Sequence, residues 1–145
     1  KRMTIIGTGK NRVDVSYVSD AASAHVNALE ALIDGNACGK IYFISQGQPV
    51  VLWDWLNRIF SELGIAPLKK RISLRMAYLV ATILEGIWKL FSMKGDPPMT
   101  RFAAVELAKD HYFDISHAKN DLNYQPKYTM DEAIAKTVSD LKQYL

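Results

Sequence analysis

The chain has few of the residues that build covalent or metal-bound frameworks. Cys38 is the single cysteine among 145 residues, so the chain cannot close an internal disulfide and has no cysteine cluster for a metal. His111 and His117 are six positions apart, and no third ligand stands near them in the sequence, so no metal site is predicted. These absences favour a reducing compartment, and we expect a cytoplasmic protein.

Clustered charge is also scarce. The chain has 18 Lys and Arg against 15 Asp and Glu, a net charge of +3. No segment combines clustered Lys or Arg with spaced aromatic residues, as binders of single-stranded nucleic acid do, so we expect no nucleic-acid partner. At 145 residues with a hydrophobic content of 49%, the chain is long enough for one core and too short for two ordinary domains.

The eight glycines form no phosphate-binding loop. Gly7 and Gly9 precede a predicted strand, whereas such a loop leads from a strand into the N-terminus of a helix. The remaining glycines are too far apart for a G-x-G-x-x-G or G-x-x-G-x-x-G pattern, since they stand at positions 35, 39, 47, 64, 86 and 95. The chain therefore has no predicted dinucleotide-binding loop of its own.

What the chain does have is an ordered series of short patterns. They are G-x-G-x-N at 7–11, Asp14, Tyr-Val-x-Asp at 17–20, Ala24-His25, the apolar run 40–45, Thr100-Arg101, Tyr112-Phe113-Asp114 and Leu-Asn-Tyr-Gln-Pro at 122–126. In this order and spacing the chain resembles the C-terminal half of an extended short-chain dehydrogenase/reductase of the NAD-dependent epimerase/dehydratase superfamily. It resembles in particular the branch of 3β-hydroxysteroid and sterol-carboxylate dehydrogenases. Asn123 stands where that family has Gly, a mild departure because Asn tolerates the left-handed conformation.

The resemblance implies an α/β fold in which this chain is the mostly helical, C-terminal substrate-binding lobe of an extended Rossmann-type dehydrogenase. We expect one unit over 1–145. Within it, strand-helix-strand 13–45 returns to the Rossmann sheet and 50–145 forms the helical lobe with short accessory strands. The dinucleotide-binding half is expected upstream of Lys1. No tyrosine here is followed four residues later by Lys, the pair that family members use for proton transfer, so no catalytic residue is expected in this chain.

Local patterns predict the elements of this lobe. Alternation over 13–18 predicts a strand, Asp20 is a candidate N-cap for a helix over 21–34, and 40–45 and 112–115 are β-rich runs. Ser73 and Thr100 are candidate caps of helices over 74–92 and to about 108, and a further helix is predicted over 50–63. Ser116 is a candidate cap for a helical turn that ends at Leu122. The last helix is predicted from the capping box of Thr129 and Glu132, with an apolar stripe of Ile134, Val138, Leu141 and Leu145.

One position bears on the substrate. The resemblance implies that sugar-nucleotide enzymes of the superfamily carry Arg immediately before the residue that Asp14 matches, where it binds the diphosphate. Val13 stands at that position here, and Arg12 would point to the opposite face of the strand. This favours an NAD(P)-dependent oxidoreductase acting on a secondary alcohol or ketone of a 3β-hydroxysteroid-like or lipid-like substrate. The alternatives are a sugar-nucleotide epimerase/dehydratase or dihydroflavonol-reductase-like enzyme, and a non-catalytic binding member of the superfamily.

The resemblance also suggests residues that contact a ligand. It places Asn11, Tyr17 and Val18 beside the cofactor or substrate pocket and Thr100 and Arg101 near its rim. NAD or NADP is expected as the cofactor, bound mainly by the upstream half. His25 is expected to be a core histidine that hydrogen-bonds to backbone, because its helix should be buried.

The segment 74–92 allows two interpretations. Residues 76–84 are nine uncharged residues between Arg75 and Glu85, too few to span a bilayer. One interpretation is a helix buried in the lobe and packed on all sides. The other is an interfacial helix in peripheral contact with a membrane. The cations near anionic headgroups would then be Lys69, Lys70, Arg71 and Arg75. A lipid-like small molecule is the expected substrate, and a homodimer is a further expectation.

Overall fold

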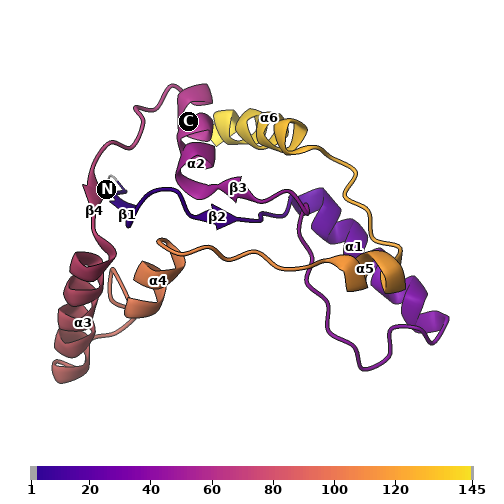
Figure 1. Cartoon of the computed structure of the whole chain (residues 1–145), viewed down its shortest axis with the longest axis horizontal. Helices are drawn as coiled ribbons and strands as arrows, with labels where there is room; N and C mark the ends of the chain where they lie inside the picture. The colour runs from indigo at the N-terminus through magenta and orange to yellow at the C-terminus, as the bar shows by residue number, and fades with distance from the viewer. Residues whose placement is uncertain (1–2, 145) are drawn as a thin grey trace. The chain divides into compact units, whose positions relative to one another are not determined.

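The structure, a computed structural model, describes residues 3–144, in which six α-helices outnumber short strands (Figure 1). Each strand has only two residues, so helices carry most of the packing. In chain order the elements are β1 (Ile5–Ile6), β2 (Arg12–Val13), α1 (Val18–Ile33), β3 (Val50–Val51), α2 (Leu52–Glu62), β4 (Arg71–Ile72), α3 (Leu74–Leu90), α4 (Arg101–Glu106), α5 (Ser116–Leu122), α6 (Met130–Leu141) and the 3₁₀ helix η1 (Lys142–Tyr144).

The chain folds into two compact units, and each is built from two separate stretches. Unit 1 contains the described residues up to 12 together with 51–111, and unit 2 contains 13–50 and the described residues from 112 onward. The chain passes from one unit to the other at β2, at β3 and after His111. Each unit therefore combines segments that are distant in sequence.

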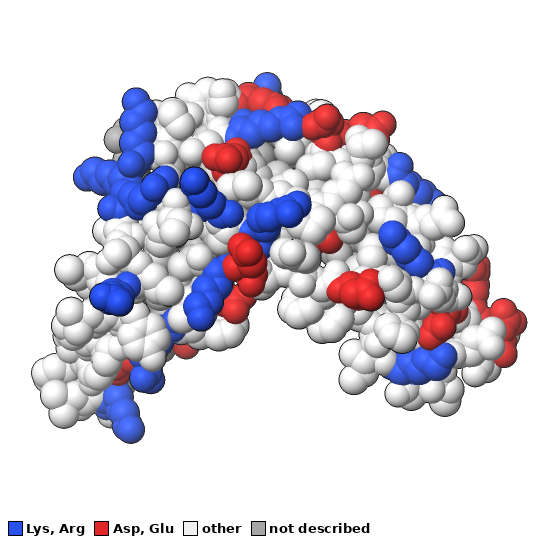
Figure 2. Space-filling model, in the orientation of Figure 1, with Lys and Arg blue, Asp and Glu red and all other residues white. Residues whose placement is uncertain are grey.

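Unit 1 is organised around a short parallel strand pair and three helices. Ile5 is in register with Arg71 and Ile6 with Ile72. Trp53 of α2 is 1% exposed, and its indole N–H donates to the carbonyl of Leu107 at 3.2 Å. The buried cluster of this unit comprises Ile5, Ile6, Trp53, Ala77 and Ala104. Figure 2 shows Lys and Arg side chains gathered around β4.

The predicted helices of unit 1 are confirmed, with ends that differ by a few residues. Ser73 Oγ accepts from the amide of Met76 at 3.2 Å at the start of α3. Thr100 Oγ1 accepts from the amide of Ala103 at 3.1 Å at the start of α4. These side chains satisfy amides that have no partner within the helix, which is why the starts were predictable from local sequence.

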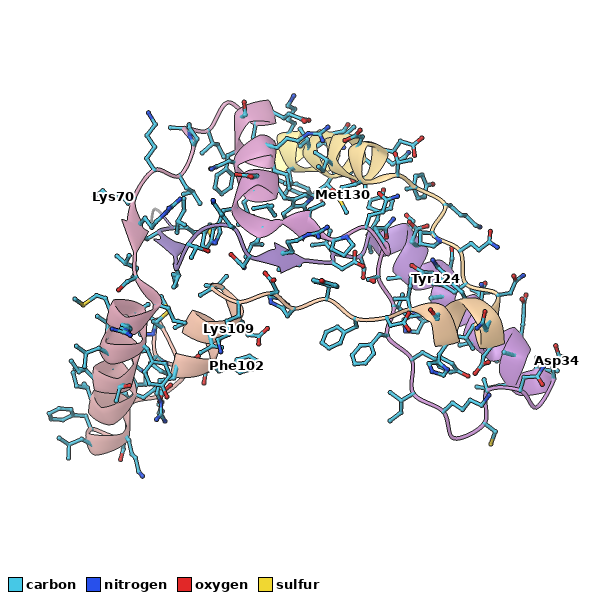
Figure 3. All side chains as sticks on the ribbon, in the orientation of Figure 1. Asp34, Lys70, Phe102, Lys109, Tyr124 and Met130 are labelled. Atoms are coloured by element: carbon cyan, nitrogen blue, oxygen red, sulfur yellow. The ribbon has the colours of Figure 1, made fainter. Side chains whose placement is uncertain are left out.

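Unit 2 is formed by α1 packed on α5, followed by α6. Small residues of α1 and α5, among them Ala24 and Ala118, share a buried cluster with Tyr124, which Figure 3 shows just after α5. Asn123 has φ of 51° and ends α5 in the left-handed conformation, as predicted. The capping box of Thr129 and Glu132 is also confirmed. Ile134 and Val138 of the predicted stripe are buried and Leu141 is 40% exposed, whereas Leu145 lies outside the described residues.

The strands predicted in unit 2 do not form ladders. Only Val13 of 13–18 is in a strand, and 40–45 and 112–115 are in none. A strand needs a continuous neighbour, and the described contacts beside 13–18 are isolated ones: the Gln46 amide donates to the Val15 carbonyl at 3.0 Å and Ser16 Oγ to the Ile44 carbonyl at 2.8 Å. The alternation of 40–45 still determines which of its side chains are buried. Tyr42 and Ile44 pack against the α1–α5 cluster, while Ile41 and Phe43 are exposed.

Two predicted caps are wrong. Helix α1 begins at Val18 with Tyr17 as its N-cap, so Asp20 lies inside the first turn, 1% exposed, and its carboxylate accepts from residues distant in sequence. At α5 the N-cap is Ile115. Ser116 does not cap, because its amide donates to Asp114 Oδ1 at 2.9 Å and its hydroxyl at 2.5 Å.

Candidate functional site

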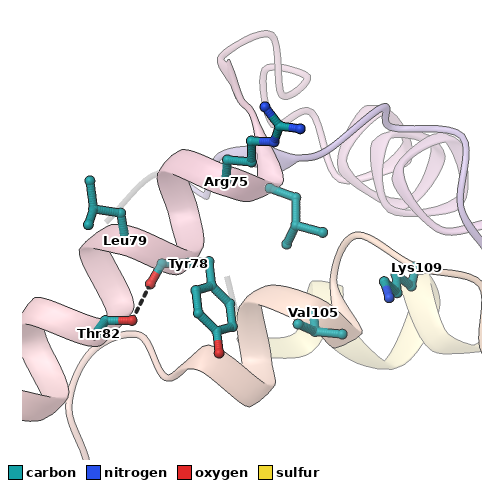
Figure 4. Close-up of a pocket in the computed structure, with 7 residues that line it drawn as sticks. Arg75, Tyr78, Leu79, Thr82, Val105 and Lys109 are labelled. Carbon is teal, nitrogen blue, oxygen red and sulfur yellow. Dashed lines mark hydrogen bonds between the residues drawn. The ribbon is translucent and has the colours of Figure 1, made fainter.

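An apolar groove in unit 1 is the main candidate for a ligand site. It lies between α3 and α4 and has a volume of about 590 Å³. In Figure 4, Tyr78 points from α3 toward α4, with Val105 and Lys109 following along the chain. A groove of this size and apolar character is typical of small-molecule sites. Its lining is Leu74, Arg75, Tyr78, Leu79, Thr82, Val105 and Lys109.

The charges of this groove all have one sign. Arg75 and Lys109 are exposed cations, and no carboxylate belongs to the lining given above. The hydroxyl of Thr82 is not free to donate to a ligand, because it already donates to the carbonyl of Tyr78 at 2.8 Å. The groove can therefore accept an apolar body and an acidic group at its edge.

Thr100 and Arg101 are held by unit 1 itself. Thr100 caps α4, and the amide and Nε of Arg101 donate to the two carboxylate oxygens of Glu85 at 2.7 and 2.6 Å. The backbone hydrogen bond from Arg101, followed by its side chain, lowers the pKa of Glu85. Glu85 raises the pKa of Arg101 further, with a smaller contribution from Tyr78. The pair of Glu85 and Arg101 thus joins α3 to α4 beside the groove. Contact of Thr100 and Arg101 with a substrate stays a prediction.

Asn11 also has a structural position. It is 3% exposed. Its side-chain Nδ2 donates to the backbone carbonyl of Lys109 at 3.4 Å, and its backbone carbonyl accepts from the amide of Leu52 at 3.0 Å. Its Oδ1 has no hydrogen-bond partner among the described residues. Asn11 therefore connects the segment before β2 to the residue at one end of the groove.

Gly7 and Gly9 do not form a cofactor cradle. A Cβ on Gly7 would meet the Cβ of Ala108 at 3.0 Å, and one on Gly9 would meet the guanidinium of Arg71 at 2.9 Å. Both glycines also have positive φ, 76° and 69°, a backbone conformation that residues other than glycine rarely adopt. The space at each glycine is thus filled by the protein. These residues do not fit a dinucleotide, and nothing else in the described residues supplies a phosphate loop.

Tyr17 and Val18 belong to unit 2. The amide of Tyr17 donates to Gln46 Oε1 at 3.0 Å, and its ring meets that of Tyr128 edge-on, with centroids 4.9 Å apart. Val18, the first residue of α1, is 72% exposed. Tyr17 is thus fixed by neighbours, whereas Val18 presents an apolar side chain outward. Ligand contact remains a prediction for both.

A buried polar network in unit 2 went unrecognised in the sequence. Gln46 Nε2 donates at 2.8 Å both to Asp20 Oδ2 and to the carbonyl of Tyr128. The amide of Lys127 donates to Asp20 Oδ1 at 2.8 Å. Nearby, the hydroxyl of Tyr124 donates to the carbonyl of Ser45 at 3.1 Å, and burial, then Asp20 and Asp14, raises the pKa of Tyr124 to about 12. The network joins three segments, and its groups satisfy one another, so it is a structural element.

Other titratable groups of unit 2 are at its surface. Lys40 Nζ lies 2.9 Å from Asp121 Oδ2 beside a shallow hollow of about 450 Å³ that Tyr42 and His117 also line. The hydrogen bond from Lys40, then that from Tyr42, lowers the pKa of Asp121. His25 makes the predicted backbone contact, with Nδ1 2.8 Å from the carbonyl of Ala21, but it is exposed. Among residues 3–144 no group of three or more potential ligands could hold a metal ion.

Comparison with solved structures defines the class of fold. The crystal structure of gox2253 is similar with a TM-score of 0.59 and 27% identity, covering 92% of this chain and 38% of that one. The UDP-glucuronic acid 4-epimerase from Bacillus cereus, solved in complex with NAD, is similar with a TM-score of 0.56 and 19% identity, covering 98% of this chain and 36% of the epimerase. The chain therefore has the fold of a mostly helical lobe of a Rossmann-type enzyme, as predicted.

Sequence comparison defines the family. A model of the 3-beta hydroxysteroid dehydrogenase/isomerase family matches residues 1–76, and the chain belongs to this family. Similar proteins include 2-alkyl-3-oxoalkanoate reductases of Stenotrophomonas maltophilia (38% identity, 93% of this chain, 41% of that protein) and Shewanella oneidensis (37%, 97% and 37%). The sterol-4-alpha-carboxylate 3-dehydrogenase of Schizosaccharomyces pombe is 31% identical over 92% of this chain and 40% of the enzyme. The chain spans about two fifths of the length of these relatives.

Proposed function

We propose that the protein to which this chain belongs is an NAD(P)-dependent oxidoreductase that moves hydride between a nicotinamide and a secondary alcohol or ketone of a lipid-like acid. This chain supplies the lobe that binds the apolar part of the substrate. The observation that carries the proposal is the α3–α4 groove, which combines apolar walls with Arg75 and Lys109 and no lining carboxylate. Family membership supports the chemistry.

The names of the relatives share one chemical feature. A 2-alkyl-3-oxoalkanoate has its ketone on the carbon next to the one that bears the carboxylate. A sterol 4-carboxylate oxidised at carbon 3 has the same relation between the reacting carbon and the acid. Both are acids with a large apolar body. We therefore propose a 3-oxo or 3-hydroxy acid with an alkyl or ring substituent as the substrate class.

The groove suits such a molecule for two physical reasons. Burying an alkyl chain against Leu74, Tyr78 and Val105 removes apolar surface from water, worth roughly 25 cal/mol per Å². Lys109 at one end can pair with a carboxylate, and an ion pair of this kind has no competing acid in the groove lining. The groove would thus hold the tail and the acid, while the reacting carbon faces segments outside this chain.

The position before Asp14 speaks against a sugar nucleotide. Val13 is 4% exposed, so no cation stands where the resemblance implies a diphosphate-binding Arg. The backbone of Arg12 is held by its neighbours, with its amide donating to Asp110 Oδ1 at 2.7 Å and its carbonyl accepting from His111 at 3.0 Å. This arrangement supports the lipid-like substrate over the epimerase alternative.

We propose that the cofactor-binding residues and the proton-transfer pair belong to segments outside this chain. The space beside Gly7 and Gly9 is filled by other residues of the protein. The nicotinamide supplies the hydride when it is bound. Subunit association as a homodimer is a further proposal.

The test mixes the full-length protein with NADH or NADPH and a 2-alkyl-3-oxoalkanoate. The reaction is followed by the absorbance of the reduced nicotinamide. We expect oxidation of the cofactor with the acid and a much higher KM with its methyl ester. Conversion of a UDP-sugar to its epimer would establish the epimerase alternative instead. Binding without turnover of either substrate would establish the non-catalytic alternative.

A matched pair of variants tests the groove. Lys109→Gln should raise KM for the acid about tenfold, because it removes one charged hydrogen bond, and should leave KM for the ester unchanged. Lys142→Gln in η1 removes another exposed cation, in unit 2, and should change neither value. Equal effects of Lys109→Gln on acid and ester would contradict the assignment of this residue to the carboxylate.

A further inference from the structure

Helix α3 packs against the rest of unit 1 with one side only. Ala77 and Ala81 are 1% and 0% exposed, and α3 packs on α4. Ile83 and Leu90, on the opposite side of the helix, are 54% and 78% exposed. The interpretation of 74–92 as a helix packed on all sides is therefore wrong for the described contacts, and peripheral contact with a membrane stays a prediction. The side of α3 that faces α4 determines the shape of the groove.

The groove has two ends of different chemistry. Lys109, which follows α4, lines the groove together with Leu74 at the start of α3. Arg101, at the start of α4, contacts Glu85 late in α3, so the two helices run in opposite directions. The lining on α3 extends from Leu74 to Thr82, three positions before Glu85. From Leu74 to Glu85 a helix that rises 1.5 Å per residue extends roughly 16 Å.

An ion pair closes the end of the groove that lies away from Lys109. Glu85 accepts from the amide and from Nε of Arg101 at 2.7 and 2.6 Å. The pKa of Arg101 is raised by Glu85 and then by Tyr78, whose ring lines the groove. Figure 4 shows this ring pointing from α3 toward α4. The phenol and the ion pair therefore lie together at the point where the apolar lining stops.

A charged end limits what an apolar groove can hold. Each methylene that is buried against the walls removes apolar surface from water and favours binding. A methylene that reached Glu85 and Arg101 would have to separate the two side chains or displace water from their charged atoms. An apolar group compensates neither cost. The gain in affinity with each carbon should therefore stop at the ion pair.

We propose that Glu85 and Arg101 set the greatest length of alkyl chain that the groove accepts, while Lys109 pairs with the acid at the other end. The distance between the two ends measures the chain. Tyr78 acts as a positioning residue, since its phenol lies beside the guanidinium of Arg101. The identity of the reacting acid rests on the proposed function, whereas the length limit can be measured with acids that do not react.

The first test measures the affinity of the full-length protein for unbranched alkanoates of increasing length. Calorimetry is used below the concentrations at which the acids form micelles. Each added methylene should tighten binding between about twofold and fourfold, the larger value for full burial, until the chain reaches the ion pair. Longer chains should gain nothing further. A steady gain through the whole series would overturn the proposal, as would no gain at any length.

Two variants should move the limit in opposite directions. Glu85→Ala with Arg101→Ala removes the ion pair, and chains beyond the original limit should then bind at least about fourfold more tightly than to the unaltered protein, the gain of one buried methylene. Thr82→Phe places a ring inside the groove before the ion pair and should end the gain at a shorter chain. The readout is the length at which the gain ends, which a general loss of stability would not move.

Each variant has a matched control. Lys40→Ala with Asp121→Ala removes an ion pair of unit 2 whose side chains are 50% and 24% exposed, against 51% and 26% for Arg101 and Glu85. It should leave the limit where it is. Thr82→Val keeps the size of the side chain and should do the same. An equal shift in a variant and its control would overturn the proposal, as would the absence of a shift in both groove variants.

Turnover distinguishes this inference from the proposed function. If both hold, kcat/KM for 2-alkyl-3-oxoalkanoates should rise with the length of the alkyl chain and level off at the length found in binding. A limit in binding without reduction of any 3-oxo acid would sink the proposed function and leave the length limit standing. Reduction with kcat/KM that rises through the whole series would overturn the length limit and leave the proposed function standing.

Discussion

Helices α1 and α3 are similar in length and both leave apolar side chains exposed, but the charges around them differ. Helix α1 has 16 residues and α3 has 17. Between positions 18 and 39 the sequence has no Lys or Arg, and its exposed acids are Glu30 and Asp34. Between positions 69 and 94, which include α3, it has six cations and one acid. Exposed apolar surface therefore marks both helices as contact surfaces, and the charge beside it distinguishes what each can contact. The two helices therefore differ in the charge of the partner that each would attract.

The two units differ in the same way in their polar groups. In unit 2 the carboxylate of Asp20 is buried, and three donors from distant segments satisfy it. In unit 1 Arg75 and Lys109 border an open groove without an acid in its lining. Polar groups that satisfy one another hold a fold together, whereas uncompensated charges at an apolar groove are available to a ligand. This contrast supports our proposal that the substrate site lies in unit 1.

The largest expected effect breaks the network of unit 2. Asp20→Ala removes one of the two acceptors of Gln46 Nε2 and the acceptor of the amides of Lys127 and Tyr128. We expect a loss of about 3 kcal/mol in the free energy of unfolding. Urea unfolding of the purified protein measures it. Glu30→Ala, an exposed acid on the same helix, should change stability by less than about 0.5 kcal/mol. Similar losses for the two variants would refute the importance of the network.

An intermediate effect comes from giving α1 the charge of α3. Glu30→Lys with Asp34→Lys surrounds an exposed apolar face with cations, and positive charge at the end of a helix also complements its dipole. Binding to vesicles that contain phosphatidylglycerol should rise roughly 25-fold, or about fivefold for each of the two new cations near the surface. Flotation with the unaltered protein as reference measures the change. No gain would show that charge does not separate the two helices.

A smaller effect depends on pH. Burial raises the pKa of Tyr124 to about 12, above the value of about 10 for an unfolded tyrosine. The folded state thus favours the neutral phenol. This contribution to stability is complete below pH 10 and is lost as the pH rises from 10 to 12. In urea unfolding at pH 9 and pH 11, the stability gap between the unaltered protein and Tyr124→Phe should narrow at the higher pH.

Tyr42 offers a second test of the same effect. Its pKa is also raised, first by burial and then by Asp121, so Tyr42→Phe should show a narrowing of its own in the same direction. A gap for Tyr124→Phe that stays constant between the two pH values would contradict the buried phenol.

Local sequence determined the helices and several, but not all, of their ends. Ser73, Thr100 and the pair Thr129 and Glu132 cap within three residues of themselves, and Asn123 adopts the left-handed conformation by itself. The order of the short patterns was also sufficient for the family and the class of fold, because they are properties of the chain read from end to end. The apolar and cationic character of 69–94 could be read in the same way.

Only the tertiary structure decided which groups are satisfied and which are exposed. Asp20 meets Lys127 at a separation of 107 residues, a partner that no local pattern indicates, and so a predicted cap became a buried network. The runs 13–18 and 40–45 have strand-like alternation, but a ladder requires a neighbouring segment in register, and alternation alone cannot supply one. The exposure of α3 and the groove beside it likewise depend on which helices pack on it. An interaction within one helical turn depends only on residues that are adjacent in the sequence. Burial depends on how segments that are distant in the sequence pack together.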